Sequence, residues 1–97
     1  MSKHTPGPFF TSCPHGGTIY VEARLRGSTI QEVCSVGPTE DPEQQEFNAQ
    51  LFAKAPQLLL ALIDAHSILK GIAGELPSLK ERLVAYENLI AAAGGEE

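Results

Sequence analysis

The stretch Asp41–Lys70, DPEQQEFNAQLFAKAPQLLLALIDAHSILK, decides the expected fold. Asp41 is a good helix N-cap because its carboxylate can accept a hydrogen bond from a backbone N–H of the first turn. Pro42 suits the first helical position, and Gln44 stands three residues after the cap, as in a capping box. These signals predict that a helix begins at Asp41.

Pro56 interrupts the helical pattern in the middle of this stretch. A proline has no N–H to donate, and it disfavours helical backbone at the residue before it, here Ala55. We therefore expect the helix to kink or to restart at this point. Apolar residues on both sides of the break follow one helical stripe: Phe47, Leu51, Leu58, Leu62, Ala65 and Leu69.

The arm after Pro56 is apolar on more sides than a small sheet can cover. Leu58, Leu59 and Leu60 follow one another at about 100° around the helix axis, so together they span roughly 200°. Burial against a sheet uses only part of this surface, and a second copy of the chain is an economical cover for the rest. The pattern therefore predicts a homo-oligomer.

Residues 9–36 read as three short antiparallel strands, at 9–13, 18–25 and 29–36. The middle strand alternates apolar and polar residues, which is typical of a half-buried strand. The sequence Arg26-Gly27-Ser28 is a plausible hairpin connection. The third strand alternates imperfectly.

In this third strand, Ile30, Cys34 and Val36 would share one face, while Val33 would lie on the other. Two arrangements account for this pattern: a bulge that re-aims the strand, or partial cover on both faces. The residue alternation alone does not choose between them.

A second helix is predicted over residues 77–93. Ser78 and Glu81 have the spacing of a capping box, and Gly94-Gly95 closes the helix. The chain is therefore predicted to be one α+β domain over residues 1–97. Its parts are an extended lead-in (1–8), an antiparallel sheet (9–36), a proline-kinked helix (41–70) and a C-terminal helix (77–93).

Charge and composition narrow the classes of partner. The 97-residue chain carries a net charge of −5, from 7 basic and 12 acidic residues, which is the opposite of the balance in a typical nucleic-acid-binding protein. We therefore expect no long nucleic acid as partner. No apolar run approaches the roughly 20 residues of a transmembrane helix, and the N-terminus lacks an apolar signal core, so we expect a cytoplasmic protein with no membrane partner.

Motifs for catalysis or metal binding are absent from the sequence. It contains no G-x-S-x-G, P-loop, G-x-G-x-x-G or H-E-x-x-H pattern. Cys13 and His15 have a C-x-H spacing, which is not that of a structural zinc site. We expect no enzyme activity, no catalytic residue, no metal and no cofactor. A reducing compartment would keep Cys13 and Cys34 as thiols, and whether either has a role stays open.

Arg24 and Arg26 are candidates for ligand contact at the end of the second predicted strand. At a spacing of two in a strand they would share one sheet face, and Tyr20 would lie on the same face. An aromatic ring and two guanidinium groups can stack on a base and bind phosphates. The alternative interpretation is a solvated strand face whose charges protect the edge of the sheet.

Asn48 is the unusual residue of the first helix. Asparagine is a poor helix former at an interior position. One interpretation is an ordinary surface residue. The other is that its amide, which both donates and accepts, hydrogen-bonds a ligand or the neighbouring chain.

Two segments resemble a group of small phage and prophage accessory proteins. The first is His4-Thr5-Pro6-Gly7-Pro8 followed by an aromatic residue, here Phe9. The second has the pattern N-A-x-L-x-A-x-A-P-x-L-L-x-A-L over residues 48–62. Phe9 stands where tryptophan is frequent, and Leu60 where a charged residue is frequent, which makes this helix more apolar.

The layout, a sheet followed by this helix and a second helix, is also similar to that of the anti-Thoeris sponges. These oligomeric phage proteins sequester cyclic ADP-ribose-type signals and, in some cases, cyclic oligonucleotides. The resemblance implies ligand pockets at subunit interfaces, lined by arginine, aromatic and asparagine side chains, in the cytoplasm of the host cell. Only Asn48 lies in a matching motif, whereas Arg24, Arg26, Tyr20 and Phe9 are candidates by residue type.

Two functions therefore remain open. One is a non-enzymatic protein that sequesters a nucleotide-derived immune signal at subunit interfaces. The alternative is a protein–protein interaction module that inhibits or regulates a host factor without a small ligand. The excess of leucine after Pro56 suits both.

Overall fold

The computed structural model describes residues 4–14 and 16–95, which pack as two compact units. The sheet unit comprises residues 6–56, and the helical unit comprises residues 57–95 with residues 4 and 5. A three-stranded antiparallel sheet followed by helices confirms the predicted α+β class. The units are described separately below, and a single domain over the whole chain stays a prediction.

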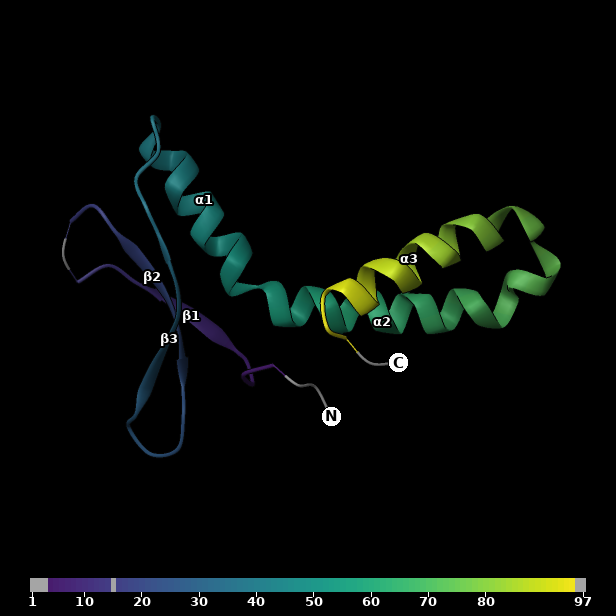
Figure 1. Cartoon of the computed structure of the whole chain (residues 1–97), viewed down its shortest axis with the longest axis horizontal. Coiled ribbons are helices and arrows are strands. Elements are labelled where there is room, and N and C mark those ends of the chain that lie inside the picture. The colour runs from purple at the N-terminus through teal and green to yellow at the C-terminus, as the bar shows by residue number, and fades with distance from the viewer. Residues whose placement is uncertain (1–3, 15, 96–97) are drawn as a thin grey trace. The chain divides into compact units, whose positions relative to one another are not determined.

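The sheet unit has the strand order β1-β2-β3, with all neighbours antiparallel (Figure 1). The strands are β1 (Phe9–Ser12), β2 (Ile19–Arg24) and β3 (Ile30–Val36). Helix α1 (Pro42–Ala53) packs against one face of this sheet, which leaves the opposite face without a helix of the same unit.

The core between α1 and the sheet is built from small and β-branched side chains. Val21 and Ala23 are fully buried at 0% exposure, and Ala49 and Ala53 face them from the helix. Short alanine side chains let the helix backbone approach the sheet closely. The buried cluster and the half-buried side chains around it are Val21, Val36, Ala49, Ala53, Phe9, Ile19 and Cys34.

The apolar stripe predicted for the first helix does not form this core. Phe47 is 64% exposed and Leu51 is 56% exposed, because the helix turns its Gln45–Ala49–Ala53 side to the sheet. The side-chain amide of Gln45 helps to select that orientation. Its Nε2 donates to the carbonyl oxygens of Gly17 and Val36, each at 2.9 Å.

The third strand contains the bulge that its sequence allowed. Val21 pairs with Cys34, but the next residue, Glu22, pairs with Glu32, so Val33 is the extra residue. The bulge shifts the alternation. Ile30 pairs with Arg24 and therefore lies on the outer face, so the expectation that Ile30 shares a face with Cys34 and Val36 is wrong.

The first helix begins as predicted. The Asp41 Oδ1 accepts a hydrogen bond from the backbone N–H of Glu43 at 2.9 Å, and Pro42 is the first helical residue. The break near Pro56 is a restart. Helix α1 ends at Ala53, and α2 begins two residues later at Ala55. This places Pro56 in the first turn of α2, where a missing N–H costs no helical hydrogen bond.

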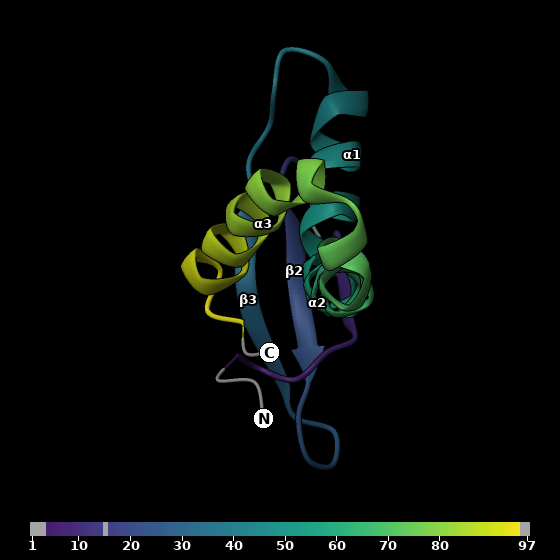
Figure 2. The ribbon, with the colours of Figure 1, turned by 90° about the vertical axis from the view of Figure 1, so that its right-hand side faces the viewer.

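The helical unit is a hairpin of two long helices joined by short 3-10 turns. The elements are α2 (Ala55–Ile72), η1 (Ala73–Glu75), η2 (Pro77–Leu79) and α3 (Lys80–Ala92). Helices α2 and α3 lie side by side in both views (Figures 1 and 2). The hairpin brings the two ends of this stretch of chain back together.

The predicted capping box at the start of the last helix is wrong. Leu79 is the N-cap of α3, and no side chain caps it, because the chain enters the helix from the preceding 3-10 turn. A helical conformation at Leu79 continues directly into α3, so Ser78 is not at the boundary.

The seam between α2 and α3 contains a buried histidine. His66 is 1% exposed, and its Nε2 lies 3.2 Å from the Oε1 of Glu87 on α3. Leu83 and Ile90 on α3 and Ala73 after α2 are the buried apolar side chains of this unit. The hairpin is therefore held by a thin apolar seam with a polar pair within it.

Helix α3 ends at the predicted glycine pair. Gly94 has φ +76°, and the N–H groups of Gly95 and Gly94 donate to the carbonyls of Ile90 and Ala91 at 2.8 and 3.0 Å, as in a Schellman motif. The imidazole of His4 packs here, with Nε2 2.6 Å from the carbonyl oxygen of Ala93. The positive φ favours glycine at this position, and a Cβ on Gly94 would lie 2.8 Å from that same nitrogen, so the imidazole would have to shift.

Candidate functional site

The outer face of the sheet, which α1 does not cover, carries two of the predicted ligand residues. Tyr20 and Arg24 lie on this face together, as their spacing in the strand predicts. Phe10 of β1 joins them, because it pairs with Glu22, the residue midway between Tyr20 and Arg24. The outer face thus combines aromatic and cationic side chains.

Arg24 is held in place by an aromatic ring. The guanidinium carbon of Arg24 lies 5.8 Å from the centroid of the Phe10 ring, within the range of a cation–π interaction. A guanidinium near an aromatic ring keeps N–H groups that can donate to an anion. Phe10 therefore restricts the positions that the Arg24 guanidinium favours.

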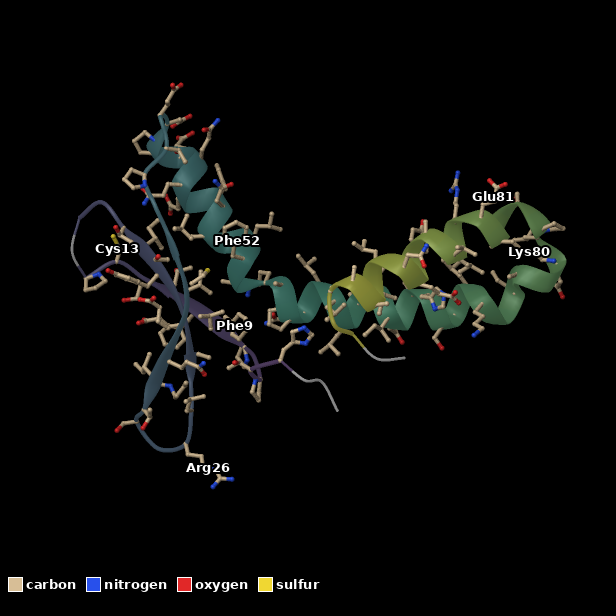
Figure 3. All side chains as sticks on the ribbon, in the orientation of Figure 1. Phe9, Cys13, Arg26, Phe52, Lys80 and Glu81 are labelled. Carbon is tan, nitrogen blue, oxygen red and sulfur yellow. The ribbon has the colours of Figure 1, made fainter. Side chains whose placement is uncertain are left out.

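Arg26 lies near Arg24 but belongs to the loop after β2. Strand β2 ends at Arg24, so Arg26 belongs to the hairpin connection, and the expectation that the strand alternation places it beside Arg24 is wrong. Figure 3 shows Arg26 at the tip of this hairpin. The two arginines nevertheless line one open cavity of about 580 Å³ with Pro6, Leu25 and Thr29.

The cavity is open, its volume lies in the range of small-molecule sites, and its charged lining residues are the two arginines. Small-molecule sites usually have volumes of about 300–1,000 Å³. The two arginines are at the hairpin end, whereas Glu22 and its β3 partner Glu32 lie further along the sheet. The positively charged side chains are therefore at the hairpin end of the outer face, and the acidic ones are nearer its middle.

Phe9 and Asn48 lie outside this cavity. Phe9 pairs with Ala23 on the face toward α1, where it packs against the buried core. Asn48 is exposed on α1, one turn before Leu51 and Phe52, which are 56% and 45% exposed. Asn48 therefore belongs to a largely apolar outward side of the helix.

Several residues of the cavity were not identified from the sequence. Pro6, Leu25 and Thr29 line the cavity, and Phe10 lies beside it, near Arg24. These residues come from different segments and meet only through the pairing of the strands and the path of the lead-in. The adjacent aromatic pair at residues 9 and 10 was a usable signal, since neighbouring strand residues face opposite ways. The register that sets Phe10 beside Arg24 is not encoded locally.

The two motifs of the phage-protein resemblance meet in the sheet unit. A Cβ on Gly7 would lie 3.1 Å from the Cβ of Pro56 and 3.2 Å from its Cγ, so the lead-in packs tightly against the proline that begins α2. This contact, like that of His4 with the end of α3, is one of packing. It gives Gly7 and Pro56 a structural reason to occur together.

The two cysteines and the histidines do not form a recognisable reactive centre in the described part of the chain. Burial, and secondarily the charge of Glu32, raises the pKa of the Cys34 thiol, which lowers its thiolate fraction. Cys13 is exposed at the end of the sheet opposite Arg26 (Figure 3). Within residues 4–14 and 16–95, no three His, Cys, Asp or Glu residues are grouped to hold a metal ion, and His15 lies outside these residues.

Helix α2, with the turn that follows it, is apolar over a greater length than its longest uninterrupted apolar run. The segment Ala55–Glu75 is long and apolar enough to cross a membrane by length and composition, with a mean hydropathy of 1.2. Only 11% of that window is buried. The expectation of no membrane partner therefore stays a prediction, and the exposed surface of α2 requires an explanation.

Comparison with known proteins places the chain in a phage family. No curated protein and no solved structure matches it. Residues 1–97, the full length of the chain, match the family described as Salmonella phage P22 protein Y8K6. This match does not include the similarity in layout to sponge proteins. The chain is therefore a member of the Salmonella phage P22 protein Y8K6 family.

Proposed function

We propose that this phage protein is a non-enzymatic binding protein that sequesters a nucleotide-derived immune signal. The ligand would be a cyclic ADP-ribose-type molecule or a cyclic oligonucleotide, held where two copies of the chain meet in the host cytoplasm. The observation that supports this proposal is the cavity of about 580 Å³ at which Arg24, oriented by Phe10, and Arg26 converge.

The recognition chemistry is that of a phosphate-bearing ring compound. Arg24 and Arg26 would donate charge-assisted hydrogen bonds to the phosphate oxygens. Leu25 and Pro6 offer apolar surface to a base or ribose. The cavity is open on one side, so a second copy of the chain would complete the enclosure of the ligand. Asn48 would contribute from such a neighbouring copy, since it does not line this cavity.

Binding is tested by calorimetry with cyclic ADP-ribose and with cyclic dinucleotides. The proposal predicts stoichiometric binding to one of these classes, followed by release of a ligand of unchanged mass when the protein is heated. Absence of binding to every member of the set would refute the proposal. A ligand recovered with an altered mass would show an enzyme instead.

The site itself is tested by charge removal. The double change Arg24→Ala and Arg26→Ala should weaken binding by about tenfold or more for each arginine, because a hydrogen bond to a charged group contributes about 1.5–3 kcal/mol. Arg82→Ala, an exposed arginine on α3, is the matched control for loss of positive charge. Equal losses in Arg82→Ala and in the double variant would show only a general electrostatic effect.

A second candidate function has its own support. The outward side of α1 exposes Phe47 at 64%, Leu51 at 56% and Phe52 at 45%. Contiguous exposed apolar side chains of this kind mark protein-interaction surfaces. Under this alternative the protein inhibits or regulates a host factor without a small ligand. It predicts a stoichiometric host partner that is lost when Phe47 and Leu51 are changed to serine and retained when Arg24 and Arg26 are changed to alanine.

A further inference from the structure

Helix α2 carries two parallel seams of heptad spacing, displaced by one residue. The covered seam comprises Leu59, Leu62, His66 and Leu69 of α2 and continues to Ala73 of η1; these residues are buried or half-buried in the α2–α3 hairpin. The second seam comprises Leu58, Ala61, Ala65, Ile68 and Ile72, and all five of its residues are exposed. Both follow the alternating three- and four-residue steps that bring side chains to one stripe of a helix. We call the second set the vacant seam.

The vacant seam is shaped for another helix. Its second and third residues are alanines; Leu58, at 51% exposure, precedes them, and Ile68 and Ile72, at 62% and 43% exposure, follow them. A small-residue centre lets two helix axes approach to the short end of the usual 8–10 Å range. The large residues at the ends then pack across the partner helix. A helix that faces lipid does not require small residues between large ones along one stripe.

The seam is complementary to itself in an antiparallel pair. With the two-fold axis between Ala61 and Ala65, Ala61 of one chain meets Ala65 of the second copy, and Leu58 meets Ile68 of the second copy. The layers of Ala61 with Ala65 are thus in the middle and the layers of Leu58 with Ile68 at the ends, so each of these layers pairs side chains of like size, and Ile72 lies beyond the last layer. No second sequence is needed to fill the seam, which favours a second copy over an unrelated partner.

The α2–α3 hairpin has few buried apolar side chains, so a partner packed on the vacant seam would stabilise it. Within its described residues, Ala73, Leu83 and Ile90 are the buried apolar side chains. A unit of roughly 40 residues is in the size range where disulfides, metals or oligomerisation usually supply the missing stability. The vacant seam extends over about 21 Å of helix, so it offers a continuous surface for that purpose.

We infer that the vacant seam of α2 is a two-fold interface, at which two copies of this chain pack antiparallel through Ala61 and Ala65. The inference rests on the assembly of copies in the proposed function but not on its ligand. The large side chains paired in this contact are Leu58 and Ile68 of each copy, so its area is well below the roughly 800 Å² per partner of a standard interface. The dimer therefore dissociates on dilution.

The charge of Asp64 distinguishes an antiparallel pair from a parallel one. Asp64 flanks the seam beside Ala65, and in the antiparallel pair it faces Asp64 of the second copy across the axis. Like charges at such spacing oppose association. Asp64→Asn should therefore tighten the dimer about twofold. In a parallel pair Asp64 would face Leu69 of the second copy, and the same change would leave the affinity unaltered.

The test is sedimentation equilibrium over a range of concentrations, with the full chain and two matched variants. The wild-type protein should change from its 10.4 kDa monomer to about twice that mass as concentration rises. Ala65→Glu should abolish the dimer, whereas Ser67→Glu, which adds the same charge at an exposed position off the seam, should retain it. Circular dichroism of both variants checks that the helices remain folded.

Three results would overturn the inference. The first is a wild-type monomer at every concentration, and the second is equal dimerisation of Ala65→Glu and Ser67→Glu. The third is sedimentation of the wild-type protein with phosphatidylcholine–phosphatidylglycerol vesicles that Ala65→Glu abolishes, which would assign the seam to a membrane. Absence of calorimetric binding together with an intact dimer would refute the ligand proposal and leave the two-fold interface standing.

Discussion

Replacement of Gln45 tests how α1 is fixed on the sheet. Its Nε2 donates to the Gly17 and Val36 carbonyls at 2.9 Å each, and the side chain is only 9% exposed. Each hydrogen bond contributes about 1 kcal/mol net, and removing the donor while the Val36 carbonyl stays buried adds up to about 1 kcal/mol. Gln45→Met keeps the volume and loses both donors, so it should cost about 2–3 kcal/mol.

Such a loss is large for a chain of this length. A domain of 97 residues is expected to have about 5–15 kcal/mol of total stability. At about 4–8 °C per kcal/mol, the midpoint of thermal unfolding should fall by roughly 10–20 °C, measured by circular dichroism. Gln44→Ala, one residue away and exposed, is the control and should stay within about 0.5 kcal/mol of wild type.

The variant Gln45→Glu adds a pH signature. An ionised carboxylate can only accept, so it would face two carbonyl oxygens without a donor. Burial and these oxygens raise the pKa of the introduced carboxyl in the folded state above its unfolded value of about 4.3. The variant should therefore be closest to wild type below that pH and lose stability as pH rises. The reasoning fails if Gln45→Met unfolds within about 0.5 kcal/mol of wild type, or if Gln45→Glu shows no such pH dependence.

Three further outcomes follow from the helical unit and the cysteines. Gly94→Ala should lower the free energy of unfolding by about 1–2 kcal/mol because of its positive φ, and by more because the His4 imidazole packs against this position. Gly74→Ala is the control: a Cβ there meets nothing within 4 Å, so thermal unfolding should be nearly unchanged. His66→Ala should cost about 2–4 kcal/mol in denaturant unfolding, as large-to-small core changes do, and a value near zero would show that the buried pair with its carboxylate partner on α3 is dispensable. Cys34 should react with iodoacetamide more slowly than exposed Cys13 near pH 8 and accelerate further as pH rises, because its pKa is raised; equal rates across the pH range would contradict this.

The features that local chemistry dictates were predictable from the chain. Asp41 and Pro42 start a helix, Pro56 forces a restart, and Gly94-Gly95 ends the last helix. Each depends on a few adjacent residues and on hydrogen bonds within one turn. The failed prediction at Ser78 shows the limit of the same reasoning. A 3-10 turn that enters the helix directly removed the need for a side-chain cap.

The candidate site was predictable only in part. The alternation of β2 is sufficient to place Tyr20 and Arg24 on one face. It does not reveal that the strand stops at Arg24, nor that Phe10 of another strand orients the guanidinium. Both depend on the register between strands, which the chain sets through contacts between residues that are distant in sequence.

The sequence by itself determined the α+β class, the order of the elements, the helix start at Asp41 and the break at Pro56, since these follow from residue periodicity and local backbone chemistry. The tertiary structure decided which sides of those elements face inward. Gln45 and two alanines, not Phe47 and Leu51, turn α1 to the sheet, because small side chains and a paired amide allow closer packing. That choice, made by contacts between distant residues, determines which surfaces of the protein remain available to a ligand or to a second copy.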